Sequence, residues 1–188
     1  MDHAERHLIA ELRRVGHQPP RTLADALRVA SRQAKNLLLI TETYEPPVDP
    51  AILLADPKVA ITYTGELRRV SGVCQWVGSR YLIAVNRREP VQRQRFTVFH
   101  EFKHALDGAR VTEGLNRFSR EGKRPAAEFV ADYFASCVLM PEWWVMDAVK
   151  HARDLEHLAR YFGVSKDAMR IRLESLGLDR GLVEAKVR

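Results

Sequence analysis

Apolar residues recur at three- and four-residue steps in two stretches near the N-terminus, 3–15 and 22–40, and this spacing predicts two amphipathic helices. At the start of the second stretch, Thr22 and Asp25 have the spacing of a capping box, which favours a helix start there. The segment 44–50 contains three prolines and is expected to be a loop.

Three short runs rich in β-forming residues come next, at 59–64, 72–77 and 80–86. Gly78-Ser79 between the last two runs is a hairpin signal. Together these runs predict a small antiparallel sheet of three strands. Within the last run, Tyr81–Asn86 suits either a sheet edge that pairs with an extended peptide or a buried central strand, because it is apolar.

From Pro90 onward the helical spacing returns, and a polar loop rich in Gly and Arg at 108–125 interrupts it. The expected helices cover 91–107, 126–139, 142–151, 154–162 and 166–177. Helices, then a sheet, then helices give an α+β architecture that is mostly helical. Because Pro141 ends the preceding helix, we expect a main domain at 1–140 and a helical tail at 141–188 that packs on it.

Length and composition fit an ordinary globular protein. The 188 residues are 46% hydrophobic and 29% charged, which argues against disorder. The N-terminus carries charges where a signal peptide needs an apolar stretch, and the apolar run 37–40 is too short to span a bilayer. Cys74 and Cys137 fit free thiols in a reducing cytoplasm, where we expect the protein to reside. The net charge of +6 does not by itself indicate a nucleic-acid partner.

The sharpest chemical feature is the run His100-Glu101-Phe102-Lys103-His104. On a helix the two histidines lie one turn apart on the same face, so both imidazoles can reach one ion. Glu101 projects beside them, where a carboxylate can take a proton from a water molecule. A catalytic zinc site needs a third protein ligand, but the extension typical of metzincins is missing, because Asp107 and Arg110 stand at its positions.

Glu128 and Asp132 are the best-placed carboxylates for this third position. They share one face of a predicted helix whose small alanines permit a close approach to the histidine helix. One carboxylate can bind the metal while the other accepts a hydrogen bond from a ligand imidazole. Glu113 and Glu121 are nearer in sequence, but they lie in the expected loop.

These paired motifs resemble gluzincin metallopeptidases, and more narrowly the ImmA/IrrE family. The similarity extends over 72–178 and is carried by the segments 93–101 and 128–141, whereas the first seventy residues match only loosely. The resemblance implies a zincin-like fold and a bound zinc ion, with manganese or a similar divalent ion as the alternative. It also implies metal ligation by His100, His104 and Glu128, a hydrogen bond from Asp132 to a ligand imidazole, and Glu101 as general base.

Two positions depart from the family pattern. Lys103 stands where the family usually has Gly, which affects the cleft and the substrate preference more than metal binding. Asp132 stands where many members have Asn. The sequence does not choose the donor that stabilises the oxyanion, for which the candidates are Tyr133, Arg95, His151 and His157.

The C-terminal run 155–165 resembles the first helix and turn of a helix-turn-helix, and the next helix carries cations that can contact DNA: Lys166, Arg170 and Arg172. We favour the simpler interpretation, in which Gly163 and Ser165 cap two packed helices. Three large side chains are expected to pack the tail onto the main domain: Trp143, Trp144 and Met146.

The resemblance implies an intracellular zinc-dependent endopeptidase that cleaves a regulatory protein. The expected partner is a helix-turn-helix transcriptional repressor, and no membrane is involved. The alternative is a DNA-binding or repressor-binding regulatory module with a structural metal site. The intact Glu101 and the open three-ligand site favour the peptidase.

Overall fold

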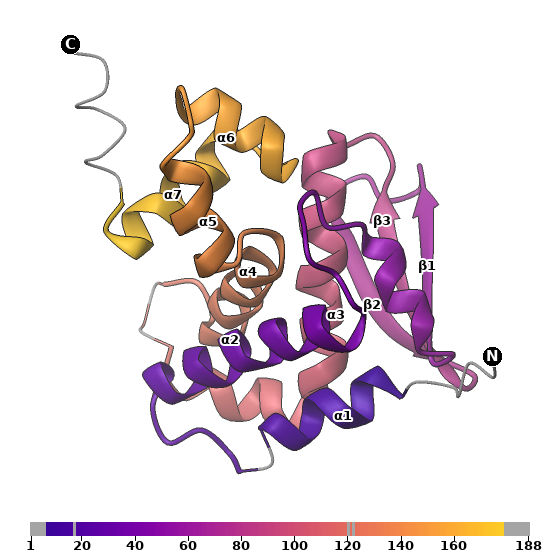
Figure 1. The fold of residues 1–188 in the computed structure, drawn as a ribbon. Helices are drawn as coiled ribbons and strands as arrows, with labels where there is room; N and C mark the ends of the chain where they lie inside the picture. The colour runs from indigo at the N-terminus through magenta and orange to yellow at the C-terminus, as the bar shows by residue number, and fades with distance from the viewer. Residues whose placement is uncertain (1–6, 17, 120, 122, 179–188) are drawn as a thin grey trace.

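The computed structural model describes residues 7–16, 18–119, 121 and 123–178, and it has the expected α+β architecture of many helices and a small sheet (Figure 1). The sheet lies on one side of α3, and α4 and the C-terminal helices lie on the other side (Figure 1). In chain order the elements are α1 (Leu8–Val15), α2 (Leu23–Ile40), the 3-10 helix η1 (Pro50–Ala55), β1 (Val59–Thr64), β2 (Gly72–Val77), β3 (Arg80–Asn86), α3 (Val91–Asn116), α4 (Ala126–Leu139), α5 (Glu142–Val149), α6 (Leu155–Phe162) and α7 (Lys166–Leu176).

The two N-terminal helices form where the apolar spacing places them. The Thr22 hydroxyl accepts a 3.0 Å hydrogen bond from the Asp25 amide, and the Asp25 carboxylate accepts one of 3.0 Å from the Thr22 amide. The predicted capping box is therefore confirmed. Residues 3–6 of the first expected helix lie outside the described residues.

The sheet has the strand order β1-β3-β2, with β1 parallel and β2 antiparallel to β3. The prediction of a purely antiparallel sheet is therefore wrong, because the sheet is mixed. Alternation of apolar residues indicates which face of a strand is buried, but it carries no information about strand direction. The hairpin at Gly78, which has a φ of 62°, returns the chain so that β3 lies beside β1 in the same direction.

β3 is the central strand, and its Ile83 and Val85 are fully buried. An edge role for 81–86 is therefore wrong, and the alternative of a buried central strand is confirmed. β2 lies at an edge of the sheet, and it packs against α3. A Cβ atom at Gly72 would lie 3.1 Å from the Ala84 carbonyl oxygen and 3.2 Å from Cγ of Glu101, so only glycine lets β2 begin this close to α3.

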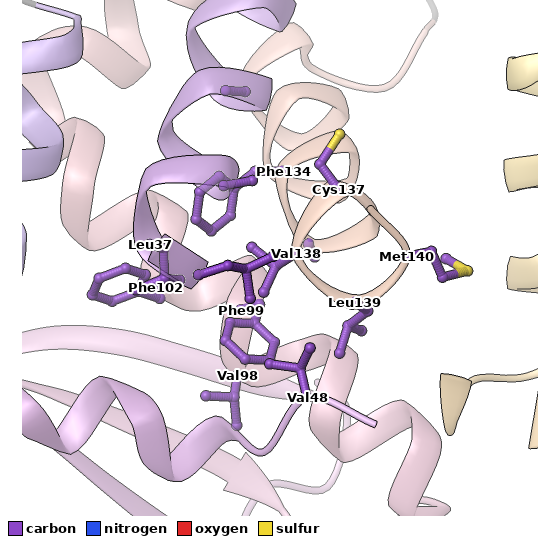
Figure 2. Close-up of a cluster of buried hydrophobic side chains, with 14 of the residues drawn as sticks. Leu37, Val48, Val98, Phe99, Phe102, Phe134, Cys137, Val138, Leu139 and Met140 are labelled. Carbon is purple, nitrogen blue, oxygen red and sulfur yellow. The ribbon is translucent and has the colours of Figure 1, made fainter. Parts of the chain in front are cut away.

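The core lies between α2, α3 and α4. Figure 2 shows Phe99 and Phe102 of α3, Phe134 and Val138 of α4, and Leu37 of α2, all of them fully buried. The Phe102 and Phe134 ring centroids are 6.3 Å apart, a normal distance for an aromatic pair. Buried alanines occupy the surrounding positions on α2 and α4, which lets the helices pack closely: Ala30, Ala34, Ala127, Ala131 and Ala135.

The helix α3 extends to Asn116, so the expected loop at 108–125 is wrong over its first half. Gly108 has non-helical angles (φ 63°, ψ 172°) and forms a kink that separates two helical stretches of α3, so the expected helix end at 107 agrees with this break. The carbonyl groups just before the kink need other donors. Arg13 of α1 supplies them, with 2.9 Å hydrogen bonds to the carbonyls of Ala105 and Leu106.

The turn between the tail helices α6 and α7 caps both of them. Gly163 ends α6 in the left-handed conformation (φ 63°), and the Ser165 hydroxyl accepts a 3.1 Å hydrogen bond from the Ala168 amide at the start of α7. The preferred interpretation of two capped, packed helices therefore agrees with the structure. Trp144 packs against the core as expected, whereas Trp143 and Met146 are about half exposed.

We expect Arg13→Met to lower the free energy of unfolding by about 1–3 kcal/mol, because two helix carbonyls at the kink lose their donor. Urea denaturation followed by circular dichroism measures the change. Arg14→Met, at an exposed neighbour on the same helix, is the matched control. Equal losses in the two variants would contradict the role of Arg13 at the kink.

Candidate metal centre

His100 and His104 lie one turn apart on α3, and their Nε2 atoms face each other at 3.2 Å. Both side chains are largely buried, with exposures of 11% and 21%. Burial lowers the pKa of His104, and the neighbouring His100 lowers it further, while Glu128 opposes both effects. His104 is therefore held in the neutral form, which is the form that binds metals.

Glu128 reaches this pair from the first turn of α4. Its Oε1 lies 3.1 Å from Nε2 of His104, and its Oε2 lies 3.5 Å from Nε2 of His100. One ligand atom from each of the three residues lies within 4.8 Å of the others, a grouping that could hold a metal ion. The structure thus brings together two imidazoles and one carboxylate from helices that are adjacent in space.

These distances fit a zinc ion. Ligand atoms at about 2.0–2.1 Å from a tetrahedral zinc ion are roughly 3.3 Å from one another. The two Nε2 atoms are 3.2 Å apart, and each Glu128 oxygen lies near one of them, Oε1 3.1 Å from His104 and Oε2 3.5 Å from His100. Two imidazoles and one carboxylate are also the donor set of catalytic zinc sites that keep one position open.

Asp132 lies one turn after Glu128 and contacts the other nitrogen of His100, with Oδ1 2.8 Å from Nδ1. Burial by itself would raise the pKa of Asp132, but hydrogen bonds with His100 and Arg124 outweigh it and hold the pKa below its ordinary value. An ionised Asp132 accepts the Nδ1 proton, so the lone pair of Nε2 points toward His104 and Glu128.

Arg124, which the sequence reasoning did not single out, pairs with both carboxylates of α4. Its Nη2 is 3.2 Å from Oε2 of Glu128, and its Nη1 donates to Asp132. Arg124 precedes Glu128 by four residues and Asp132 by eight. This spacing was the available signal in the sequence for the contacts, because such positions share a helix face. The side chain is 54% exposed, so the guanidinium is a solvent-accessible positive charge beside the candidate centre rather than a buried ion.

Glu101 of α3 lies beside the start of β2, within electrostatic reach of His100 and Glu128. Burial raises the pKa of its carboxyl, and Glu128 raises it further, while His100 and a backbone hydrogen bond from Cys74 oppose the increase. The Cys74 thiol is half-buried beside it, and burial together with Glu101 raises the thiol pKa to about 12. Cys74 therefore remains protonated at neutral pH, whereas the increase brings the pKa of the Glu101 carboxyl closer to neutral.

The four candidate oxyanion donors have different surroundings. Arg95 donates a 2.5 Å hydrogen bond to the Gly163 carbonyl and so holds the turn between the tail helices. His151 and His157 are exposed, and none of the described contacts of the metal-centre residues involves them. Tyr133 follows Asp132 on α4 and is half-buried, and burial raises the pKa of its hydroxyl, with Cys137 adding to the effect. Of the four, Tyr133 is the candidate that the fold leaves open.

Lys103 points away from the candidate ligands. Its side chain is 3% exposed and forms a buried ion pair with Asp107 on the same helix. Burial lowers the pKa of Lys103, and the Asp107 carboxylate opposes the decrease. The expectation that Lys103 narrows the cleft is therefore not met, since the side chain is directed into the protein. The carboxylate of Asp107 is committed to this pair.

The match to a known protein family points to a fold of the metallopeptidase type. The sequence profile of peptidase family M78, the IrrE N-terminal-like domain, matches residues 61–174. The chain therefore belongs to this family, and the resemblance to the ImmA/IrrE family is confirmed. Among curated proteins, none matches the chain.

A solved structure of a Mycobacterium tuberculosis transcriptional regulator has the same fold, with a TM-score of 0.59 and 19% sequence identity. The similarity covers 89% of this chain and 51% of the regulator, so the chain spans about half the length of that protein. Among the described helices, none combines the length and the apolar character that crossing a membrane requires.

Lys103→Met should destabilise the protein by about 3–5 kcal/mol, because it leaves the Asp107 carboxylate buried without a cation. Adding Asp107→Leu should restore most of the lost stability, since no charge then remains buried. Guanidinium denaturation of both variants and the wild type measures the differences. A double variant as unstable as Lys103→Met would show that charge pairing is not what this site requires.

Proposed function

We propose that this protein is a zinc-dependent endopeptidase in which His100, His104 and Glu128 hold the ion and Glu101 is the general base. One observation carries the proposal: two imidazole Nε2 atoms and the Glu128 carboxylate converge at separations of 3.1 to 3.5 Å. Asp132 contacts Nδ1 of His100, which supports its proposed role of orienting this imidazole without binding the metal itself. We also propose that residues 1–140 form the main domain and that residues 141–188 form a helical tail packed on it.

When bound, zinc supplies Lewis acidity that polarises the scissile carbonyl and makes a water molecule more acidic. Glu101 takes the proton of the attacking water and later passes it to the leaving amine. Its raised pKa suits both steps, because a carboxyl that titrates closer to neutral pH accepts and returns a proton more readily. Tyr133 is our candidate for the donor to the oxyanion.

An extended substrate can reach the centre along the edge strand β2. One side of β2 is paired with β3, and among the described residues no strand pairs with its outer edge, where a peptide could add. The strand begins against Glu101, whose carboxylate receives a hydrogen bond from Cys74 of β2. A peptide added to this edge would thus pass beside the general base.

The proposed substrate is a regulatory protein, with a helix-turn-helix repressor as the first choice. Family membership supports a protein substrate, and the similar fold of a transcriptional regulator supports a role in gene regulation. Direct DNA binding by the tail is the alternative. Of the three cations that could serve it, Lys166 pairs with Glu156 at 2.8 Å, Arg170 pairs with Asp167 at 2.9 Å, and Arg172 is buried and so does not face solvent. Salt-dependent binding to duplex DNA would support the alternative.

The metal-free protein should bind one zinc ion, and His104→Ala or Glu128→Ala should abolish tight binding because a ligand is lost. Asp132→Ala should weaken the affinity by about 10–100-fold, since His100 loses its orienting partner. Isothermal titration calorimetry measures these affinities, with the exposed Glu113→Ala as control. Zinc binding that is indifferent to Glu128→Ala would remove the proposed ligand set.

Glu101→Gln should keep zinc binding but lose cleavage by at least about 100-fold, because the general base is removed while the metal ligands remain. The assay incubates zinc-loaded protein with the repressor encoded nearest to its gene and follows fragments by mass spectrometry. Cleavage should also stop with a chelator. Full cleavage by Glu101→Gln would exclude this mechanism, and full biological activity without cleavage would favour a binding module.

A further inference from the structure

An apolar groove of about 570 Å³ lies between the start of α3, the middle of α4 and the helix α7. Its apolar walls include Phe96, Phe129, Tyr133, Met140, Ala168 and Ile171. Phe129 and Ile171 are 49% and 64% exposed, which is unusual for large apolar side chains that line a concave surface. The volume is that of a site for a ligand or a peptide segment rather than for a few water molecules.

The groove is continuous with the candidate metal centre. Asp132 lines the groove and also contacts His100 Nδ1 at 2.8 Å. Phe96 lines it one turn before His100, and the two ring centroids are 6.4 Å apart. A polypeptide that lies across the metal centre therefore has side chains within reach of the groove.

The groove carries uncompensated positive charge. Arg172 is only 4% exposed, and its Nε donates to the Met140 carbonyl at 2.9 Å. Arg93 lies over the Phe96 ring at 5.8 Å. Neither arginine forms an ion pair within the part of the chain that the structure describes. The two lining carboxylates are already paired, Asp132 with Arg124 and His100, and Asp167 with Arg170. An occupant with a carboxylate would balance this charge.

We propose that this groove binds a segment of the protein substrate beside the scissile bond, in which a large aliphatic or aromatic residue is followed or preceded by Asp or Glu. The inference rests on the proposed peptidase function and names its substrate class more closely. The apolar side chain fills the space between α4 and α7, and the carboxylate lies toward Arg172 and Arg93. α7 then forms a wall of the substrate site, so the tail contributes to specificity through contacts with protein.

The test uses two fluorescein-labelled ten-residue peptides that differ only at their centre, Leu-Glu against Ala-Gln, and zinc-loaded Glu101→Gln protein, which binds without cleaving. Fluorescence anisotropy should show about tenfold tighter binding of the Leu-Glu peptide. Ala168→Trp, which fills the groove, should remove this preference. Glu174→Trp, on α7 but outside the groove, should keep it and is the matched control.

Two further variants, measured with the Leu-Gln and Ala-Glu peptides in addition, separate the components of the preference. Arg93→Gln should reduce only the advantage of Glu over Gln, because it removes charge and leaves the apolar walls. Phe129→Ala should reduce only the advantage of Leu over Ala, and its half-exposed ring makes it a suitable replacement if Ala168→Trp does not fold. The same pairs placed in internally quenched peptides report kcat/KM for the zinc-loaded wild type.

The outcomes distinguish the two proposals. Equal binding of both peptides, or a preference that Ala168→Trp and Phe129→Ala leave intact, would overturn the groove proposal. If sedimentation shows that Ala168→Trp instead dissociates a dimer, the occupant is a second copy of this chain and the proposal is wrong. Selective binding together with no cleavage of any peptide or repressor would overturn the peptidase and leave the groove as a binding site.

Discussion

Close packing of α3 against α4 is the interaction on which the candidate centre depends. The two histidines come from α3 and the glutamate from α4, so the three ligand atoms meet only if the helix axes approach closely. Buried alanines on α4 allow this approach, and the Phe102–Phe134 contact fills the space below it. We expect a larger side chain at Ala127 or Ala131 to push α3 and α4 apart, and so to separate Glu128 from the two histidines without changing any of these three residues.

Charge around the centre is arranged in two separate groups. On the open side, Glu128 and Asp132 face the histidines and the exposed Arg124, so their negative charge can be shared between a metal ion and a guanidinium. On the closed side, Lys103 and Asp107 balance each other inside the protein. The second pair contributes no net charge to the cleft, and this explains how a lysine is accommodated between two candidate ligand histidines.

The C-terminal helices are joined to the rest of the chain by specific polar contacts as well as by packing. Arg172 of α7 donates to the carbonyl of Met140 at the end of α4, and Arg95 of α3 donates to the carbonyl of Gly163. The contact between Arg172 and Met140 lines the groove next to the candidate centre. A segment that resembles a DNA-binding motif in sequence therefore has its inner face turned toward the proposed substrate site, while its surface cations pair with neighbouring carboxylates.

The sequence by itself was sufficient for most of the helices and strands and for the residue types of the candidate metal ligands, because these depend on local spacing. The pair His100–His104, the partner Glu128 with Asp132, the capping box at Thr22 and the helix bounds of α4 and α6 all follow from periods of three and four residues. Only the tertiary structure decided strand direction, the central place of β3, the continuation of α3 past Gly108, and the positions of Arg124, Lys103 and Arg172. The physical reason is that these features depend on which distant segment supplies a partner. A strand needs a neighbour, a kinked helix needs a donor such as Arg13, and a charged side chain turns toward the counter-charge or carbonyl that the fold brings to it.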